Sequence, residues 1–201
     1  MIKNYIFDFG NVLAEFYPDK LTSACVADEE AGKIISEVVF DRIYWDNLDR
    51  GAISDDEVRE GIKSRLPETL HEDACSVYNN WVFNMTPFPG MQKLIDDISK
   101  TDKKLYLLSN ISIGFANTYK TVPWINELLS KFDGLVLSGT IGLVKPNKDI
   151  FEYVLEKFDL KADECLFIDD NAQNIEGAKS AEINGYLFDG DSEKLRGFLN
   201  L

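Results

Sequence analysis

The stretch Tyr5-Ile6-Phe7-Asp8-Phe9-Gly10-Asn11-Val12-Leu13 carries the strongest structural signal in this chain. Its first three residues form an apolar run, which is typical of a strand buried on both faces of a parallel sheet. Asp8 follows at the carboxyl end of that strand, where open parallel sheets bind their ligands. An Asp after a strand is more often a turn or cap residue, so the case for a site depends on the other strand ends.

Strand-like and helix-like segments alternate through the second half of the chain. Apolar runs predict four further strands, at residues 105–108, 135–137, 166–168 and 186–188. Apolar residues at helical spacing predict helices between them, at residues 91–98, 124–129, 146–158 and 175–181. Such alternation specifies right-handed βαβ units, and therefore an α/β fold with a doubly wound, Rossmann-like parallel sheet.

The segment 15–86 interrupts this alternation, because it lacks strand runs and has helical patterning. It is several times longer than a simple crossover needs, and Pro87-Phe88-Pro89-Gly90 marks its end. We therefore expect two domains. Residues 1–14 and 87–201 form the α/β core, and residues 15–86 form a small inserted helical cap domain.

The charge balance restricts the partners of the protein. Its 201 residues include 35 acidic and 21 basic side chains, which gives a formal net charge of −14. Nucleic acids and anionic membranes have no electrostatic reason to approach such a chain, so neither is expected as a partner. The same charge repels a phosphorylated substrate, so any anion site needs local positive charge.

Cysteine usage and apolar patterning indicate the compartment. Cys25, Cys75 and Cys165 are odd in number and widely spaced, so they form neither a disulfide framework nor a zinc site. No apolar stretch approaches 18 residues, and the first residues show no signal-peptide core. We expect a cytoplasmic protein without a membrane span.

Residues that can do chemistry follow four of the predicted strands. Asp8 ends the first strand and Ser109-Asn110 the second, Lys145 follows the third, and Asp169-Asp170 end the fourth. A Lys before a Pro is often only a solvated residue, and Asp-Asp-Asn can be only a turn. In a parallel sheet, however, these strand ends meet at one edge. Four suitable residues at four strand ends indicate an active site.

Each residue type has a physical reason to be at such a site. Asp8 and Asp170 would repel each other unless a hard divalent cation lay between them, and Mg²⁺ suits oxygen ligands together with waters and phosphate. The ammonium of Lys145 offers a point charge to phosphate and keeps a carboxylate nucleophile ionised. Ser109 and the N–H groups of the helix that follows can bind a phosphoryl oxygen. Gly10 allows the backbone to approach a ligand.

This arrangement resembles the motif set of the haloacid dehalogenase-like (HAD-like) hydrolase superfamily, over the whole chain and including the helical cap. The motifs that match in order and spacing are Asp8, Ser109, Lys145 and Asp169-Asp170. Residues 7–12, 50–54, 108–110 and 169–178 look like the branch of small bacterial sugar-phosphate phosphatases that includes α-D-glucose-1-phosphate phosphatase. The motif set is specific for the superfamily, whereas it does not specify the substrate.

The resemblance implies a Mg²⁺-dependent phosphatase that acts on a small phosphorylated metabolite, such as a hexose 1-phosphate. Asp8 would attack the phosphorus and form an aspartyl-phosphate, which water then hydrolyses. The resemblance assigns the metal to Asp8, the carbonyl of Gly10 and Asp170. Asp169 would hold a metal-bound water or contact Lys145.

The resemblance also implies which residues act on the substrate. Asp8, Lys145 and Ser109 would be the catalytic residues, with Asn174 supporting the metal shell. The residues expected to contact the substrate are Ser109, Asn110, Lys145, Gly10 and Asn11. Trp45 is added to them because it lies in the predicted cap near Asn47 and Arg50, although large aromatic residues are usually packing residues.

One departure from the superfamily pattern concerns proton transfer. Most of its phosphatases carry a second Asp two residues after the nucleophile, where this chain has Gly10. That Asp protonates the leaving oxygen, and such help is typically worth about 10²–10⁴-fold in rate. The enzyme is then slow, or uses good leaving groups such as anomeric phosphates, or relies on another group (Glu15, a water or a cap residue). We favour the second interpretation, because the glucose-1-phosphate branch carries a similar Gly.

Two other functions stay open at this point. In a metal-independent haloacid dehalogenase-type hydrolase, Asp8 would attack carbon, although the adjacent acids Asp169 and Asp170 argue against a site without a cation. A non-catalytic binding or regulatory module would keep the fold and lack the acid at Gly10. The sequence names neither the substrate nor the oligomeric state.

Overall fold

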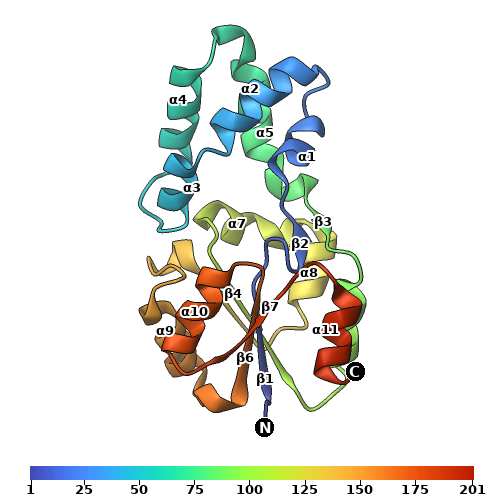
Figure 1. Cartoon of the computed structure of the whole chain (residues 1–201). Coiled ribbons are helices and arrows are strands. Elements are labelled where there is room, and N and C mark those ends of the chain that lie inside the picture. Colours follow the sequence, from blue (N-terminus) through green and yellow to red (C-terminus); the bar gives the residue numbers. More distant parts are fainter.

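A computed structural model describes residues 1–201, and its centre is a five-stranded parallel sheet of order β5-β4-β1-β6-β7 (Figure 1). The strands are β1 (Asn4–Phe7), β4 (Lys104–Ser109), β5 (Gly134–Leu137), β6 (Cys165–Asp169) and β7 (Asn184–Leu187). The chain runs outward from β1 to β5 and then returns to β6 on the other side of β1. The predicted doubly wound parallel sheet is therefore confirmed.

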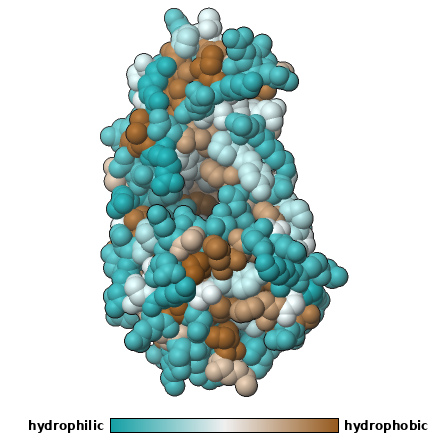
Figure 2. All heavy atoms as spheres, viewed as in Figure 1, coloured by the Kyte–Doolittle hydropathy of each residue, from teal (hydrophilic) through white to brown (hydrophobic).

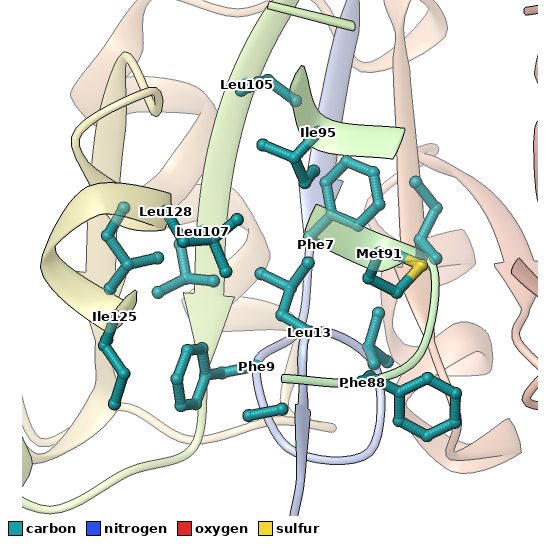
Figure 3. Packing of buried hydrophobic residues seen from close by; sticks show 14 of the residues in the cluster. Phe7, Phe9, Leu13, Phe88, Met91, Ile95, Leu105, Leu107, Ile125 and Leu128 are labelled. Carbon is teal, nitrogen blue, oxygen red and sulfur yellow. The ribbon is translucent and has the colours of Figure 1, made fainter. Parts of the chain in front are cut away.

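Helices cover both faces of this sheet. The apolar core on one face joins β1 and β4 to α6 (Met91–Ile98), α8 (Pro123–Leu129) and α11 (Ser192–Leu199). The core on the other face joins them to α9 (Lys148–Phe158) and α10 (Ala172–Ser180). Successive side chains of a strand point to opposite faces, so Phe7 enters the first core and Ile6 the second. Figure 3 shows Phe7, Phe9 and Leu107 packed in the first core.

Five helices from the segment 15–86 form a layer beyond the carboxyl ends of the strands (Figure 1). They are α1 (Pro18–Ser23), α2 (Glu29–Val39), α3 (Arg42–Leu48), α4 (Asp55–Arg65) and α5 (His71–Asn84). This layer has an apolar cluster of its own, in which Ile35, Val58 and Val77 are fully buried. None of the helices in the structure has the length and apolar character needed to cross a membrane.

Two short strands join this layer to the core. β2 (Ala14–Glu15) and β3 (Thr86–Pro87) pair antiparallel, which brings both ends of the helical segment side by side. These two strands are not predictable from the sequence, because two residues are too few to show a strand period. The predicted boundaries at residues 15 and 86 fall on this ladder.

The remaining elements are short: α7 (Ile113–Thr118), η1 (Glu68–Leu70), η2 (Tyr119–Thr121), η3 (Ser138–Thr140) and η4 (Ala162–Glu164). One predicted helix starts later than expected. Pro146 lies outside α9, after a cis peptide bond from Lys145, and Asn147 is the residue that precedes the helix. Another starts earlier, at Ala172, because the side chain of Asn171 caps its first turn.

A close backbone contact fixes α10 against the segment that carries Lys145. A Cβ atom on Gly177 would lie 2.3 Å from the carbonyl oxygen of Pro146, which is closer than van der Waals contact allows. A Cβ atom on Gly197, in α11, would meet nothing within 4 Å.

We predict opposite effects of alanine at these two helical glycines. Gly177→Ala should lower the free energy of unfolding by about 1–3 kcal/mol, because an overpacked site must shift. Gly197→Ala should raise it by about 0.5–1 kcal/mol, because alanine is the better helix former. Urea unfolding monitored by circular dichroism measures both. Equal effects at the two positions would contradict the close contact at Gly177.

Candidate active site

The strand ends bring the predicted catalytic residues together. Asp8 directly follows β1, and its backbone N–H donates to the carbonyl of Ile168 at 2.9 Å. Asp169 is the last residue of β6 and Ser109 the last of β4, and these two strands flank β1. Lys145 reaches the same edge from the loop that follows η3. All four side chains are buried.

The ammonium of Lys145 lies between two carboxylates. Its Nζ is 2.7 Å from Oδ2 of Asp169 and 2.9 Å from Oδ1 of Asp8. The contact between Lys145 and Asp8 is an ion pair and not a hydrogen bond. Oδ1 of Asp8 is buried and has no hydrogen-bond partner. Burial alone would lower the pKa of Lys145, but the two carboxylates raise it above its usual value. The side chain is therefore a cation.

The side chain of Asn110 holds the backbone of Lys145. Its Nδ2 donates to the carbonyl of Lys145 at 3.0 Å, and its Oδ1 accepts from the N–H of Lys145 at 2.8 Å. These two bonds use the amide for positioning. Asn110 also lines the hollows beside Asp8 that are described below. Its contact with the substrate stays a prediction.

Asp169 is fully buried, and both of its carboxylate oxygens have partners. Oδ1 accepts from the backbone N–H of Asn171 at 2.8 Å, and Lys145 donates to Oδ2. The Nδ2 atom of Asn174 lies 3.1 Å from Oδ1 and 3.0 Å from Oδ2. The structure thus places Asp169 in contact with Lys145, which was one of the two roles predicted for it.

Three acids could share a cation at this edge. Asp8, Asp169 and Asp170 each have a carboxylate oxygen within 4.8 Å of the others. Burial raises the pKa of Asp8 to about 6, with Lys145 acting against the rise and Asp169 adding to it. Burial also raises the pKa of Asp170, and the charge of Asp169 adds to that rise. One ammonium does not balance three carboxylates, so this all-oxygen donor set fits a hard divalent cation such as Mg²⁺.

Gly10 and Asn11 follow Asp8 in a tight turn. Asn11 has a positive φ of 54°, and its Oδ1 accepts from the N–H of Phe16 at 3.0 Å. Gly10 is half-buried and lies along the cavity beside Asp8. The side chain of Asn11 faces the polar part of that cavity together with Asp170.

Two adjoining hollows lie between the sheet edge and the helical layer. The first has a volume of about 310 Å³ and is walled mainly by the apolar side chains of Phe9, Phe16, Phe40, Trp45, Trp81, Met85 and Ile111. The second, of about 340 Å³, is lined by polar groups that include Lys145 and Asp170. Asp8 lies on the wall of both. Figure 2 shows the surface hollowed between the two parts of the molecule, with apolar atoms at its floor.

Trp45, the predicted cap contact, forms part of the apolar wall. Its indole N–H donates to the carbonyl of Val39 at 2.8 Å, so only the ring faces the hollow. The ring packs on Phe16, Phe40 and Trp81, with centroids 5.1–5.4 Å apart. Its contact with a substrate stays a prediction, and any such contact would be apolar.

Three residues of the helical layer line both hollows and were not predicted from the sequence: Arg42, Asp46 and Asp49. They are spaced by four and three residues, which is one face of a helix. That spacing is the signal that could have indicated them. It does not reveal that this face looks toward the sheet edge.

Comparison with known proteins agrees with this geometry. Residues 2–182 match the family model of the haloacid dehalogenase-like hydrolases. The chain belongs to this family. The predicted resemblance and the prediction of a hydrolytic enzyme are therefore confirmed.

Two curated HAD-like relatives are named phosphatases. A sesquiterpene phosphatase of Aspergillus oryzae is 25% identical over 183 residues, which cover 91% of this chain and 88% of that protein. A D-ribitol-5-phosphate phosphatase of Bacteroides thetaiotaomicron is 26% identical over 183 residues, which cover 87% and 86%. Their names differ in substrate, so they do not select one for this chain.

A solved HAD family enzyme of Bacteroides thetaiotaomicron, in complex with magnesium and inorganic phosphate, has a TM-score of 0.73 to this structure. It is 21% identical, and the match covers 97% of this chain and 99% of that one. At this identity the likeness shows the fold alone. It extends over both the sheet and the helical layer.

Because the three carboxylates repel one another, we predict that Mg²⁺ stabilises the protein. At a concentration of 100 times the dissociation constant, binding adds about 2.7 kcal/mol, which corresponds to roughly 5–11 °C in melting temperature. Asp170→Asn should reduce this shift several-fold. Asp102→Asn should keep it, because Asp102 is an exposed acid far in sequence from the three acids. Differential scanning fluorimetry with and without MgCl₂ measures the shift. The same shift in all three proteins would contradict a site at Asp170.

Proposed function

We propose that this HAD-like hydrolase is a Mg²⁺-dependent phosphatase that acts on a small phosphorylated metabolite through an aspartyl-phosphate on Asp8. The observation that carries this proposal is the position of Asp8. It lies 2.9 Å from a buried ammonium, beside two further acids, on the wall of both hollows. The phosphatases among its relatives support the same reaction class.

In this proposal the core residues bind and position the phosphoryl group. The carboxylate of Asp8 attacks the phosphorus, and Lys145 offsets the negative charge of the phosphoryl oxygens. Ser109 faces the hollow beside Asp8 and can donate its hydroxyl to one of these oxygens. Water then attacks the aspartyl-phosphate, which releases inorganic phosphate and restores Asp8.

The metal would be held by Asp8, the carbonyl of Gly10 and Asp170, with Asp169 next to them. When bound, Mg²⁺ neutralises charge on the phosphoryl group and on the acids around it. Support comes from the all-oxygen donor set and from the magnesium in the solved HAD enzyme. Asp169 acts mainly through Lys145, because its own oxygens are already hydrogen-bonded.

We further propose that residues 15–86 act as a cap domain that encloses the substrate. Both hollows lie between this layer and the sheet edge, with Asp8 on the core side. The polar hollow suits the phosphate, and the aromatic wall around Trp45 suits the rest of the substrate. A sugar ring such as that of a hexose 1-phosphate offers an apolar face for such a wall, which makes this substrate class our first candidate.

The same cluster disfavours the two other functions. A dehalogenase without a metal would leave Asp8, Asp169 and Asp170 close together with only Lys145 to balance them. A non-catalytic module would have no need to bury a charged Lys beside a carboxylate oxygen that has no hydrogen-bond partner. Both alternatives are therefore weaker than the phosphatase.

We predict that Asp8→Asn abolishes phosphatase activity. The amide cannot attack phosphorus, so kcat should fall at least about 10³-fold on every phosphomonoester, while the fold is retained. A screen of sugar phosphates and p-nitrophenyl phosphate with MgCl₂ measures this loss, and EDTA should remove the activity of the unchanged enzyme. Turnover that survives in the variant, or that needs no metal, would contradict the proposal.

A further inference from the structure

The proposed phosphatase reaction requires a proton for the leaving oxygen, and the turn after Asp8 has no group to supply it, because position 10 is glycine. Glu15, one of the substitutes considered from the sequence, is already engaged. Its Oε2 accepts from the hydroxyl of Thr86 at 2.6 Å and pairs with Lys20. The side chain of Glu15 also lines neither hollow. A side chain that supplies this proton therefore belongs to another element.

Asp49 lines both hollows from the side of the helical layer. It directly follows α3 as the C-cap residue, it is half-buried, and it lies on the wall of both hollows together with Asp8. Its carboxylate forms no hydrogen bond or ion pair with another side chain. The neighbouring acid Asp46, by contrast, is exposed and pairs with Arg42 at 2.8 Å. Asp49 is thus the one unpaired acid that the helical layer presents to both hollows.

The backbone next to Asp49 is anchored to the core. Gly51 has a positive φ of 63°, and a Cβ atom there would lie 2.4 Å from the carbonyl oxygen of Gly139 in η3. A Cβ atom on Gly142 would likewise lie 3.8 Å from the carbonyl oxygen of Arg50. The loop after α3 therefore rests on the segment that leads to Lys145, and Figure 1 shows this end of α3 directed toward the core. Asp49 thus lies two residues from a close backbone contact with the core.

Burial keeps part of the Asp49 population protonated near neutral pH. Burial raises the pKa of Asp49 to about 7, and the charges of Asp46 and Asp8 add to the rise. Lys145 from the core and Arg42 on the same helix act in the other direction. A general acid works best when its pKa is near the working pH.

We propose that Asp49 is the general acid and base of this enzyme, the role that an Asp at position 10 would otherwise have. This inference rests on the proposed phosphatase function. As an oxygen of Asp8 bonds to phosphorus, the bond from phosphorus to the leaving oxygen breaks. The leaving oxygen keeps the electron pair and takes the proton of Asp49, so that an alcohol departs.

The second step returns the proton. The carboxylate of Asp49 takes a proton from the water that attacks the phosphorus, and the bond between phosphorus and Asp8 breaks with its electrons on Asp8. Inorganic phosphate leaves, and both acids are back in their starting states. The nucleophile then comes from the core and the proton from the helical layer.

The test is Asp49→Asn on two substrates with different leaving groups. The parameter is kcat/KM, which includes only the steps up to departure of the leaving group. On ethyl phosphate, whose leaving oxygen needs a proton, kcat/KM should fall about 10²–10⁴-fold. On p-nitrophenyl phosphate, whose leaving group departs as a stable anion, it should change by only a few-fold.

A rescue variant separates proton transfer from a structural effect. A Cβ atom on Gly10 would meet only the Cβ of Phe16, at an ordinary distance of 3.8 Å, so Gly10→Asp is sterically tolerated. Gly10→Asp added to Asp49→Asn should restore most of kcat/KM on ethyl phosphate, whereas Gly10→Ala in the same background should not. Asp73→Asn, at an exposed acid of α5 away from the hollows, should leave both substrates unaffected.

The unchanged enzyme provides a further measurement. If Asp49 donates the proton, kcat/KM on ethyl phosphate should fall as the pH rises above about 7, because Asp49 loses its proton. The pH profile of kcat/KM on p-nitrophenyl phosphate should lack this fall. Other charged groups line the polar hollow together with Asp49: Arg42, Asp46 and Arg50 on the cap side, and Asp8, Lys145 and Asp170 on the core side. Both substrates would bind among these groups, so the ratio of the two profiles isolates the acid.

The possible results separate the two proposals. A loss of equal size on both substrates, or no rescue by Gly10→Asp, would overturn the role of Asp49 while Asp8→Asn still abolished activity. If Asp8→Asn left turnover unchanged, the phosphatase mechanism itself would be wrong.

Discussion

A buried ion cluster underlies the rest of this structure: the ammonium of Lys145 between the carboxylates of Asp8 and Asp169. A buried charge is costly unless it is paired and hydrogen-bonded. Loss of one partner from such a cluster typically costs about 3–5 kcal/mol, because the other charge stays buried without compensation. Neighbouring residues provide that compensation here. Asn174 and the backbone of Asn171 donate to Asp169, and Asn110 holds the backbone of Lys145.

This cluster also relates the topology of the sheet to its chemistry. Asp8 directly follows β1 and Asp169 ends β6, and these neighbouring parallel strands lie at the point where the strand order reverses. Lys145 arrives from beyond the opposite neighbour of β1, and α10 packs against Pro146 so closely that only glycine fits at position 177. The doubly wound sheet therefore delivers groups from distant parts of the sequence to one edge. Because the net charge of −14 repels anions, this edge needs local cations to bind a phosphorylated substrate. Lys145 is a buried cation at this edge.

The helical layer changes what this edge can do. The core alone presents a nucleophile, a cation and acids that suit a metal, all of which act on the phosphoryl group. The layer adds an aromatic wall on one side and the unpaired acid Asp49 on the other. If the proton comes from this layer, chemistry depends on how the layer sits over the sheet edge. The contact of Gly51 with Gly139 then matters for catalysis as well as for packing.

The sequence by itself determined the parallel sheet and the residues at its carboxyl edge. The buried strands β1 and β6 contain the continuous apolar runs 5–7 and 165–168. The ends of parallel strands must also meet at one edge whatever the detailed packing. Only the tertiary structure decided which side chains of the helical layer face that edge and which groups are already occupied. Asp49 and the amide of Asn110 illustrate both cases. A helical period shows that residues share a face, but contacts between residues far apart in the chain decide what that face meets, and local sequence does not encode those contacts.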